Sequence, residues 1–133
     1  MSAKAVVFLL LSLLLLTAFK LKSPRLVKAA EEQALIVTIR LGSEDMGNAE
    51  ERQRILALED QLSDAIKHSK TGDFDGDEFG NGVCTIYIYG PSTERLFSVT
   101  LPILKRFRAP AGSYVIKRYG KPGSKQVRVA IDE

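Results

Sequence analysis

The sequence predicts an α+β domain, and three observations support this prediction. Segments with the two-residue alternation of strands and segments with helical spacing follow one another along residues 31–133, and glycine- or proline-rich turns separate them. Roughly one hundred residues are enough for a single small domain with one core. The one cysteine, Cys84, excludes an internal disulfide framework, so packing must hold the domain together.

The first predicted strand and helix have the clearest local signals. Residues 34–41 alternate along the chain so that one face is richer in apolar side chains, which is typical of a strand. After a loop at 42–47, Asn48 and Glu51 have the spacing of a capping box, and Gly72 is expected to end the helix. The apolar stripe of this helix consists of Ile55, Leu58, Leu62, Ala65 and Ile66.

The second half of the domain repeats this alternation. Residues 72–82 are rich in turns and hold at most one short strand, whereas residues 83–89 are β-branched or aromatic and predict a strand. Ser92 or Thr93 is expected to cap a second helix. The apolar positions of that helix are Leu96, Val99, Ile103, Leu104 and Phe107. Residues 113–119 and 126–131 then form a hairpin, and the whole order predicts a ferredoxin-like two-layer sandwich with an extra C-terminal edge strand.

A stretch of glycine and acidic residues precedes the second strand–helix unit. It has the pattern Gly72-x-x-Asp75-Gly76-x-Glu78-x-Gly80-x-Gly82 and runs into Tyr-Ile-Tyr-Gly-Pro. This pattern resembles a family of small bacterial proteins that carry a similar stretch before a strand and a helix. The resemblance covers roughly residues 72–120. It implies a shared fold and a bacterial origin, and it brings no assigned activity.

The first thirty residues form a separate N-terminal segment. Residues 5–19 are apolar apart from Ser12 and Thr17, and a helix of that length covers about 22 Å, short of a hydrocarbon core of about 30 Å. Extending it to residues 4–22 with lysines that snorkel makes membrane spanning feasible. The best small-residue cleavage box, at 27–29, lies beyond several cations. An uncleaved membrane anchor is the favoured interpretation, and a cleaved signal peptide is the alternative.

The charges beside this segment bear on its orientation. Lys4 precedes the apolar run, whereas four cations follow it, namely Lys20, Lys22, Arg25 and Lys28. Positive charges tend to stay on the cytoplasmic side, so the cytoplasmic face of a membrane is favoured for the domain. The lysine in front of the run resembles the start of a signal peptide and argues for the periplasmic or extracellular side.

The basic character of the chain also belongs to this segment. The whole chain has a net charge of +3, but residues 1–30 hold five of the 19 Lys and Arg residues and no acidic residue. Residues 31–133 therefore contain 14 basic and 16 acidic side chains, a net charge of −2. The charge of the domain gives no support to nucleic-acid binding.

The sheet face opposite the helices is the leading candidate site. If the residues of the third strand alternate as expected, Tyr87 and Tyr89 lie on that face, and Arg40 and Arg128 join them. Lys117 and Tyr119 join as well if Ile116 packs inward. Such a surface suits a protein partner, a small anionic ligand or a second copy of the chain. The RNA-recognition motif requires aromatic residues at positions held here by valine and threonine, so nucleic acid is not expected.

The acidic glycine stretch carries an alternative hypothesis. Asp73, Asp75, Asp77 and Glu78 offer oxygen ligands of the kind that Ca²⁺ or Mg²⁺ prefers, which suggests a cation-binding regulatory module. The EF-hand pattern fails, because Glu78 stands where glycine is required and Cys84 where an acid is required. In an extended segment the three aspartates would share one face and form a solvated acidic edge.

No catalytic constellation is evident in the sequence. The only histidine, His68, lies near the expected end of the first helix beside Lys67, where solvent exposure is usual. The chain has neither a nucleophile-elbow serine nor a phosphate-binding glycine loop before a helix. Cys84 is expected to be a buried, unreactive thiol. The sequence therefore predicts a non-catalytic, membrane-tethered interaction or ligand-binding domain without a cofactor.

Overall fold

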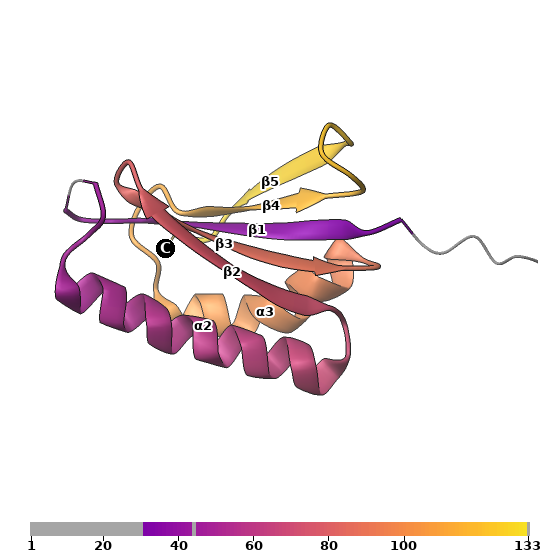
Figure 1. Ribbon diagram of the computed structural model, residues 1–133, viewed down its shortest axis with the longest axis horizontal. Helices are drawn as coiled ribbons and strands as arrows, with labels where there is room; N and C mark the ends of the chain where they lie inside the picture. The colour runs from indigo at the N-terminus through magenta and orange to yellow at the C-terminus, as the bar shows by residue number, and fades with distance from the viewer. Residues whose placement is uncertain (1–30, 44, 133) are drawn as a thin grey trace, which may run out of the picture.

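The computed structural model describes residues 31–43 and 45–132 as two helices and a five-stranded open antiparallel sheet. Figure 1 shows both helices on the same side of the sheet. The elements in chain order are β1 (Gln33–Arg40), α2 (Ala49–Ser69), β2 (Asp73–Gly80), β3 (Val83–Gly90), α3 (Thr93–Phe107), β4 (Tyr114–Arg118) and β5 (Gln126–Ala130). The α+β class predicted from the sequence is confirmed.

The predicted N-terminal anchor, residues 1–30, lies outside the described residues. Within residues 31–43 and 45–132, no helix combines the length and the apolar character that crossing a membrane requires.

The strands lie side by side in the order β2-β3-β1-β4-β5, and every neighbouring pair is antiparallel. The central strand β1 therefore separates two hairpins that follow it in the chain. The strand that the sequence left in doubt is an eight-residue edge strand, β2. The last hairpin is slightly shorter than predicted, since β4 lacks Ser113 and Tyr119 and β5 ends before Ile131.

The start of α2 has the predicted capping box. The Glu51 amide donates to Asn48 Oδ1, and the Asn48 amide donates to Glu51 Oε2, both over 2.9 Å. The Glu51 carboxylate also accepts hydrogen bonds from the preceding loop. The hydroxyl of Ser43, followed by the amides of Asn48 and Gly42, lowers the pKa of Glu51 to about 2. The ionised carboxylate thus ties the loop to the first turn of the helix.

The end of α2 differs from the prediction. The helix ends at Ser69, and Lys70 adopts the left-handed conformation (φ 53°) that the prediction assigned to Gly72. Gly72 is required for a different reason. A Cβ atom at this position would lie 2.0 Å from the backbone carbonyl oxygen of Tyr89. The glycine therefore allows a close approach between the start of β2 and the end of β3.

The core lies in one layer between the sheet and the two helices. Leu35, Val37 and Ile39 of β1 pair with Ile88, Ile86 and Cys84 of β3, and all six side chains are buried. The predicted helical positions Ile55, Leu58, Leu62 and Ile66 of α2 and Leu96, Ile103 and Leu104 of α3 are buried against them. Burying each large apolar side chain contributes about 1.5–3 kcal/mol, so this layer is the main source of stability.

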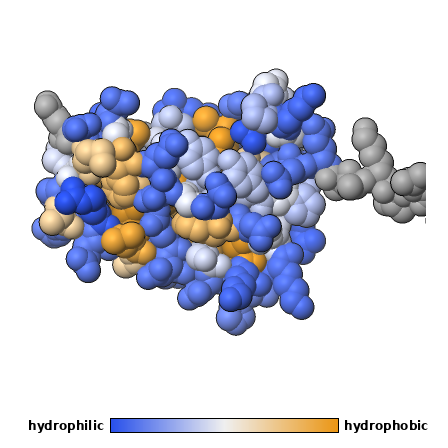
Figure 2. Space-filling view, viewed as in Figure 1, coloured by the Kyte–Doolittle hydropathy of each residue, from blue (hydrophilic) through white to orange (hydrophobic). Residues whose placement is uncertain are grey.

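Apolar residues also reach the surface in places. In the view of Figure 1, apolar patches concentrate at the end of the domain where α2 begins and β2 turns into β3 (Figure 2). Hydrophilic residues cover most of the rest of this view. The large apolar side chains that are exposed among the described residues are Met46 and Leu56.

Candidate functional site

The side of the sheet that faces away from α2 and α3 is called the open face here. Residues paired directly across antiparallel strands point to the same side, so the register defines its members. They are Ala34, Ile36, Thr38 and Arg40 of β1, Asp73, Gly76, Glu78 and Gly80 of β2, Val83, Thr85, Tyr87 and Tyr89 of β3, Tyr114, Ile116 and Arg118 of β4, and Gln126, Arg128 and Ala130 of β5.

A row of large side chains crosses the middle of the open face. Tyr87 pairs with Ile36, Ile36 pairs with Ile116, and Ile116 pairs with Arg128. The first three side chains are half-buried, and Arg128 is exposed. The row therefore presents an aromatic and aliphatic platform that ends in a guanidinium group. This arrangement combines apolar contact area with a positive charge.

The open face is cationic on β1, β4 and β5. These three strands contribute Arg40, Arg118 and Arg128 and no acidic residue to it. The Arg128 guanidinium carbon lies 3.6 Å from the centroid of the Tyr114 ring, close enough for a cation–π interaction. Arg118 Nε donates to the backbone oxygen of Gly120 over 2.9 Å. The ion pair found among residues 31–43 and 45–132 joins Lys117 and Glu94, so none of these arginines has a described carboxylate partner.

The opposite edge of the open face, on β2, is acidic. Asp73 pairs with Tyr89, and Glu78 lies beside Tyr87. The Tyr87 hydroxyl donates to Glu78 Oε2 over 3.1 Å. Burial, together with this carboxylate, raises the pKa of Tyr87. Tyr87 thus divides the acidic edge from the cationic part of the face.

The prediction placed Lys117 and Tyr119 on the open face, but they lie on the side of the sheet that faces the helices. It required Ile116 to pack inward, but Ile116 pairs with Ile36 on the open face. The neighbouring Val115 fills the core instead and is fully buried. Because side chains alternate along a strand, Lys117 then faces the helices. Tyr119, just beyond the end of β4, lies on the same side, since its hydroxyl contacts Glu94 of α3.

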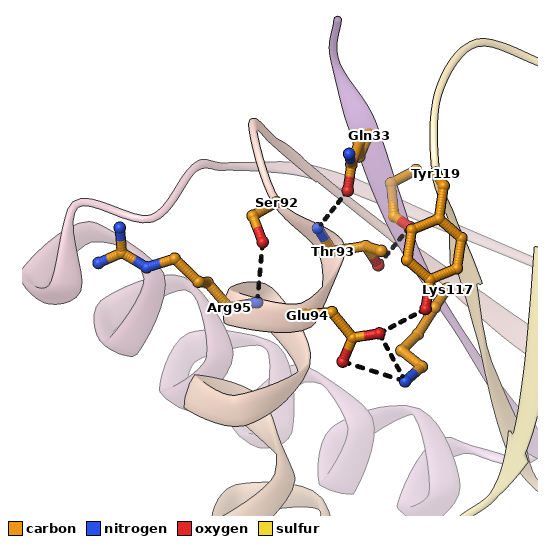
Figure 3. A network of polar contacts seen from close by, with 8 residues as sticks. Gln33, Ser92, Thr93, Glu94, Arg95, Lys117 and Tyr119 are labelled. Carbon is orange, nitrogen blue, oxygen red and sulfur yellow. Dashed lines mark hydrogen bonds and ion pairs between the residues drawn. The ribbon is translucent and has the colours of Figure 1, made fainter. Parts of the chain in front are cut away.

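Their partner on that side is Glu94, in the first turn of α3 (Figure 3). Lys117 Nζ donates to Glu94 Oε1 over 2.9 Å, and the Tyr119 hydroxyl donates to the same oxygen. The Tyr119 and Lys117 hydrogen bonds lower the pKa of Glu94, and Glu94 raises the pKa of Lys117. Lys117 Nζ also lies 5.1 Å from the centroid of the Phe97 ring. These residues attach α3 to β4.

The start of α3 is fixed to β1 by further hydrogen bonds that Figure 3 displays. The Thr93 amide donates to Gln33 Oε1 over 2.8 Å, and the buried Thr93 hydroxyl donates to the Ala34 carbonyl over 2.9 Å. Ser92 is the N-cap, since its hydroxyl accepts from the Arg95 amide. The region around Lys117 and Tyr119 is therefore a contact between layers.

The four acidic residues of the glycine stretch do not lie together. A β-bulge between Phe74 and Gly76 shifts the register of β2 against β3 by one residue. Asp73 and Glu78 consequently point to the open face, whereas Asp77 pairs with the buried Ile86 and points toward the helices. Asp75 occupies the bulge. The prediction that the three aspartates share one face is wrong, because it assumed an unbroken strand.

Asp77 instead approaches two residues that sequence reasoning did not connect with it. The carboxylates of Glu59 and Asp77 and the thiol of Cys84 have ligand atoms within 4.8 Å of one another. In the described part of the chain this Glu59 cluster is the group of at least three such residues that could hold a metal ion. The signal that could have indicated Glu59 is its spacing, four residues after the buried Ile55.

Burial has a strong effect on the Glu59 cluster. Glu59 is only 8% exposed, and burial, followed by a side-chain hydrogen bond with Asp77 and the charge of that carboxylate, raises its pKa to about 7. Cys84 is completely buried, as predicted, and burial raises its pKa to about 12. His68, by contrast, is exposed near the end of α2 and does not belong to the cluster.

Comparison with known proteins does not assign the chain to a family. No family model matches the chain, and no curated protein or solved structure is significantly similar to it. The resemblance carried by residues 72–120 stays a prediction.

Proposed function

We propose that residues 31–133 form a non-catalytic binding domain, tethered to a membrane by the N-terminal segment, whose open face binds an acidic segment of a partner protein. We also assign the domain to the ferredoxin-like class, with β5 as an added edge strand. The order β2-β3-β1-β4, with α2 after β1 and α3 after β3, supports this assignment.

The observation that carries the proposal is the group of three arginines without described carboxylate partners, on a sheet face that neither α2 nor α3 covers. A guanidinium group presents a planar fork of donors that matches a carboxylate, so arginine suits an acidic partner better than lysine does. The Tyr114 ring beneath Arg128 restricts the guanidinium before any ligand arrives. Such preorganisation reduces the entropy lost on binding.

The spacing of two of these arginines matches that of an extended peptide. Arg118 pairs with Gln126 and Ile116 pairs with Arg128, so the two arginines occupy diagonal positions on neighbouring strands. Such positions are about 7–8 Å apart. Alternate side chains of an extended chain lie about 6.6–6.8 Å apart on one side. We therefore expect acidic residues at every second position of the partner segment.

A labelled peptide that alternates glutamate and serine tests the proposal. The full-length chain should increase its fluorescence polarisation, and added salt should weaken binding because exposed charges are screened. Substituting both Arg118→Gln and Arg128→Gln should weaken binding at least about tenfold. Arg95→Gln with Arg106→Gln is the matched control, since both side chains are exposed on α3.

Two results would overturn the proposal. The first is that the acidic peptide does not bind, and the second is an equal loss of binding in the control variant. If the peptide does not bind but the Arg118 and Arg128 substitutions abolish binding of single-stranded RNA, or self-association of the chain, a different occupant uses the open face.

A further inference from the structure

The Glu59 cluster lies on the other side of the sheet, where α2 covers β2 and β3, and it is separate from the proposed binding face. Glu59 comes from α2, Asp77 from β2 and Cys84 from β3, so three elements converge on it. Cys84 pairs with Phe79 and Asp77 pairs with Ile86, which places both strand residues on the helix side.

The decisive observation is an unpartnered buried atom. Glu59 Oε1 is inaccessible to solvent and has no hydrogen-bond partner, although the side chain is more than nine-tenths buried. Buried polar atoms are almost always satisfied, because leaving one unpaired costs about twice what an average hydrogen bond gains. The carboxylate that carries this oxygen belongs to the same group as a second carboxylate and a thiol. Because the pKa of Glu59 is raised to about 7, a proton shared with Asp77 partly balances the two carboxylates, and a bound metal ion would replace that proton.

The β-bulge of β2 is what brings Asp77 into this group. Before the bulge Asp73 pairs with Tyr89, and a regular strand in that register would place Asp77 opposite Thr85 on the open face. The bulge shifts the pairing by one residue and turns Asp77 toward Glu59. Gly76, with φ of 144°, supplies a backbone conformation at the bulge that other residues rarely adopt. Bulges commonly redirect a side chain toward a functional position.

From these contacts we propose that Glu59, Asp77 and Cys84 bind a zinc ion. A thiolate ligand favours Zn²⁺ over Ca²⁺ or Mg²⁺, which take oxygen ligands only. Zinc takes four ligands in a tetrahedron, and three protein ligands with one water is a common set. Zn–O distances of about 2.0–2.2 Å and a Zn–S distance of about 2.3 Å place the donor atoms roughly 3.3–3.8 Å apart. The cluster needs only a small contraction, which the exposed Asp77 side chain can provide.

Binding would exchange protons for metal bonds. The Cys84 thiol loses its proton to solvent as the Zn–S bond forms, and any proton that Glu59 shares with Asp77 leaves as the Zn–O bonds form. One water molecule of the hydrated ion remains as the fourth ligand. Glu59 Oε1 gains the partner that it lacks. The ion would then join α2 to the edge strand β2.

The test measures zinc binding to the full-length chain after chelation and removal of metals. We expect one zinc ion per chain by elemental analysis. Zinc at about 100 times its Kd should raise Tm by roughly 11–22 °C. Cobalt(II), used as a spectroscopic substitute, should give tetrahedral d–d bands and a thiolate-to-metal charge-transfer band.

Paired variants identify the site. Asp77→Asn should weaken zinc binding at least about tenfold, since removing even a group that only supports a metal ligand weakens metal binding by that much. Glu78→Gln is the matched control, because it changes the next residue of the same strand on the opposite face. Cys84→Ala should remove the charge-transfer band. If the Cys84→Ala variant does not fold, the cobalt spectrum of the unsubstituted chain and the zinc affinity of the Asp77→Asn variant still test the proposal.

Several outcomes would overturn the proposal. Zinc that leaves Tm unchanged is one, and a cobalt complex without the thiolate band is another. Equal losses of zinc affinity in the Asp77→Asn and Glu78→Gln variants would show that the ion binds elsewhere. Binding of Mg²⁺ or Ca²⁺ as tight as that of zinc would exclude the thiol as a ligand. None of these outcomes depends on the acidic peptide binding to the open face.

Discussion

Replacing Gly72 by alanine should destabilise the domain strongly, although the change adds a single methyl group. The new Cβ atom would lie 2.0 Å from the carbonyl oxygen of Tyr89 and 3.0 Å from Leu96 Cδ2. Contacts below 3.0 Å essentially do not occur for real Cβ atoms, and the first of these involves backbone, which cannot rotate away. The two backbone segments approach each other closely at Gly90 as well, because a Cβ at Gly90 would lie 2.4 Å from the carbonyl oxygen of Thr71.

The magnitude follows from the size of this overlap. The start of β2 and the end of β3 must separate by about 1 Å or more, and overpacking of this kind costs about 1–3 kcal/mol or more. Alanine restricts the unfolded chain and returns about 0.4–1 kcal/mol of stability. We expect a net loss of about 2 kcal/mol. For a domain of this size that corresponds to a fall in Tm of roughly 8–16 °C.

Thermal and urea unfolding followed by circular dichroism would measure this loss. The matched control is Gly80→Ala at the other end of β2, where a Cβ meets no atom within 4 Å. The control should be as stable as the unsubstituted chain or more stable by up to about 1 kcal/mol. A Gly72→Ala variant within about 0.5 kcal/mol of the unsubstituted chain would refute the close approach as the reason for this glycine.

Three further predictions concern the capping box, the start of α3 and the core. The lowered pKa of Glu51 means that its ionised form stabilises the folded state above the unfolded-state pKa of about 4.5, and that this contribution disappears as the pH falls toward 2. In urea titrations, the Glu51→Gln variant should therefore be less stable than the unsubstituted chain at pH 7, and the difference in unfolding free energy should shrink below pH 4.5. A difference that does not change with pH would contradict the lowered pKa of Glu51. Thr93→Val should cost about 1 kcal/mol in the same assay, because the buried hydroxyl no longer donates to Ala34, and an unchanged midpoint would argue against that bond. Leu62→Ala should cost about 3–5 kcal/mol and exposed Leu56→Ala less than about 0.5 kcal/mol, so similar losses would contradict the burial of Leu62.

Much of the fold was predictable because its signals are local. The alternation along β1, the capping box at Asn48 and the apolar stripe of α2 each depend on residues close together in the chain. These signals placed the elements to within a few residues. The end of α2 was missed because Lys70, a residue without an obvious preference for the left-handed conformation, occupies the position that the prediction gave to Gly72.

The candidate site was predictable in part. Arg40, Tyr87, Tyr89 and Arg128 do share the open face, because their strands have one clearly richer apolar side or pair regularly. Arg118 and Tyr114 were missed. In β4 both Val115 and Ile116 are apolar, so the pattern alone gave two equivalent orientations, and the prediction chose the wrong one for Lys117 and Tyr119.

The sequence by itself determined which segments become strands and helices, since backbone preference and side-chain periodicity are local properties. The tertiary structure decided which way individual side chains face. Pairing with Ile36 turned Ile116 outward, and the bulge against β3 turned Asp77 toward Glu59, a residue eighteen positions earlier in the chain. In a strand a shift of one residue reverses every side chain, and pairing with the neighbouring strand, whether β1 for Ile116 or β3 for Asp77, sets the orientation.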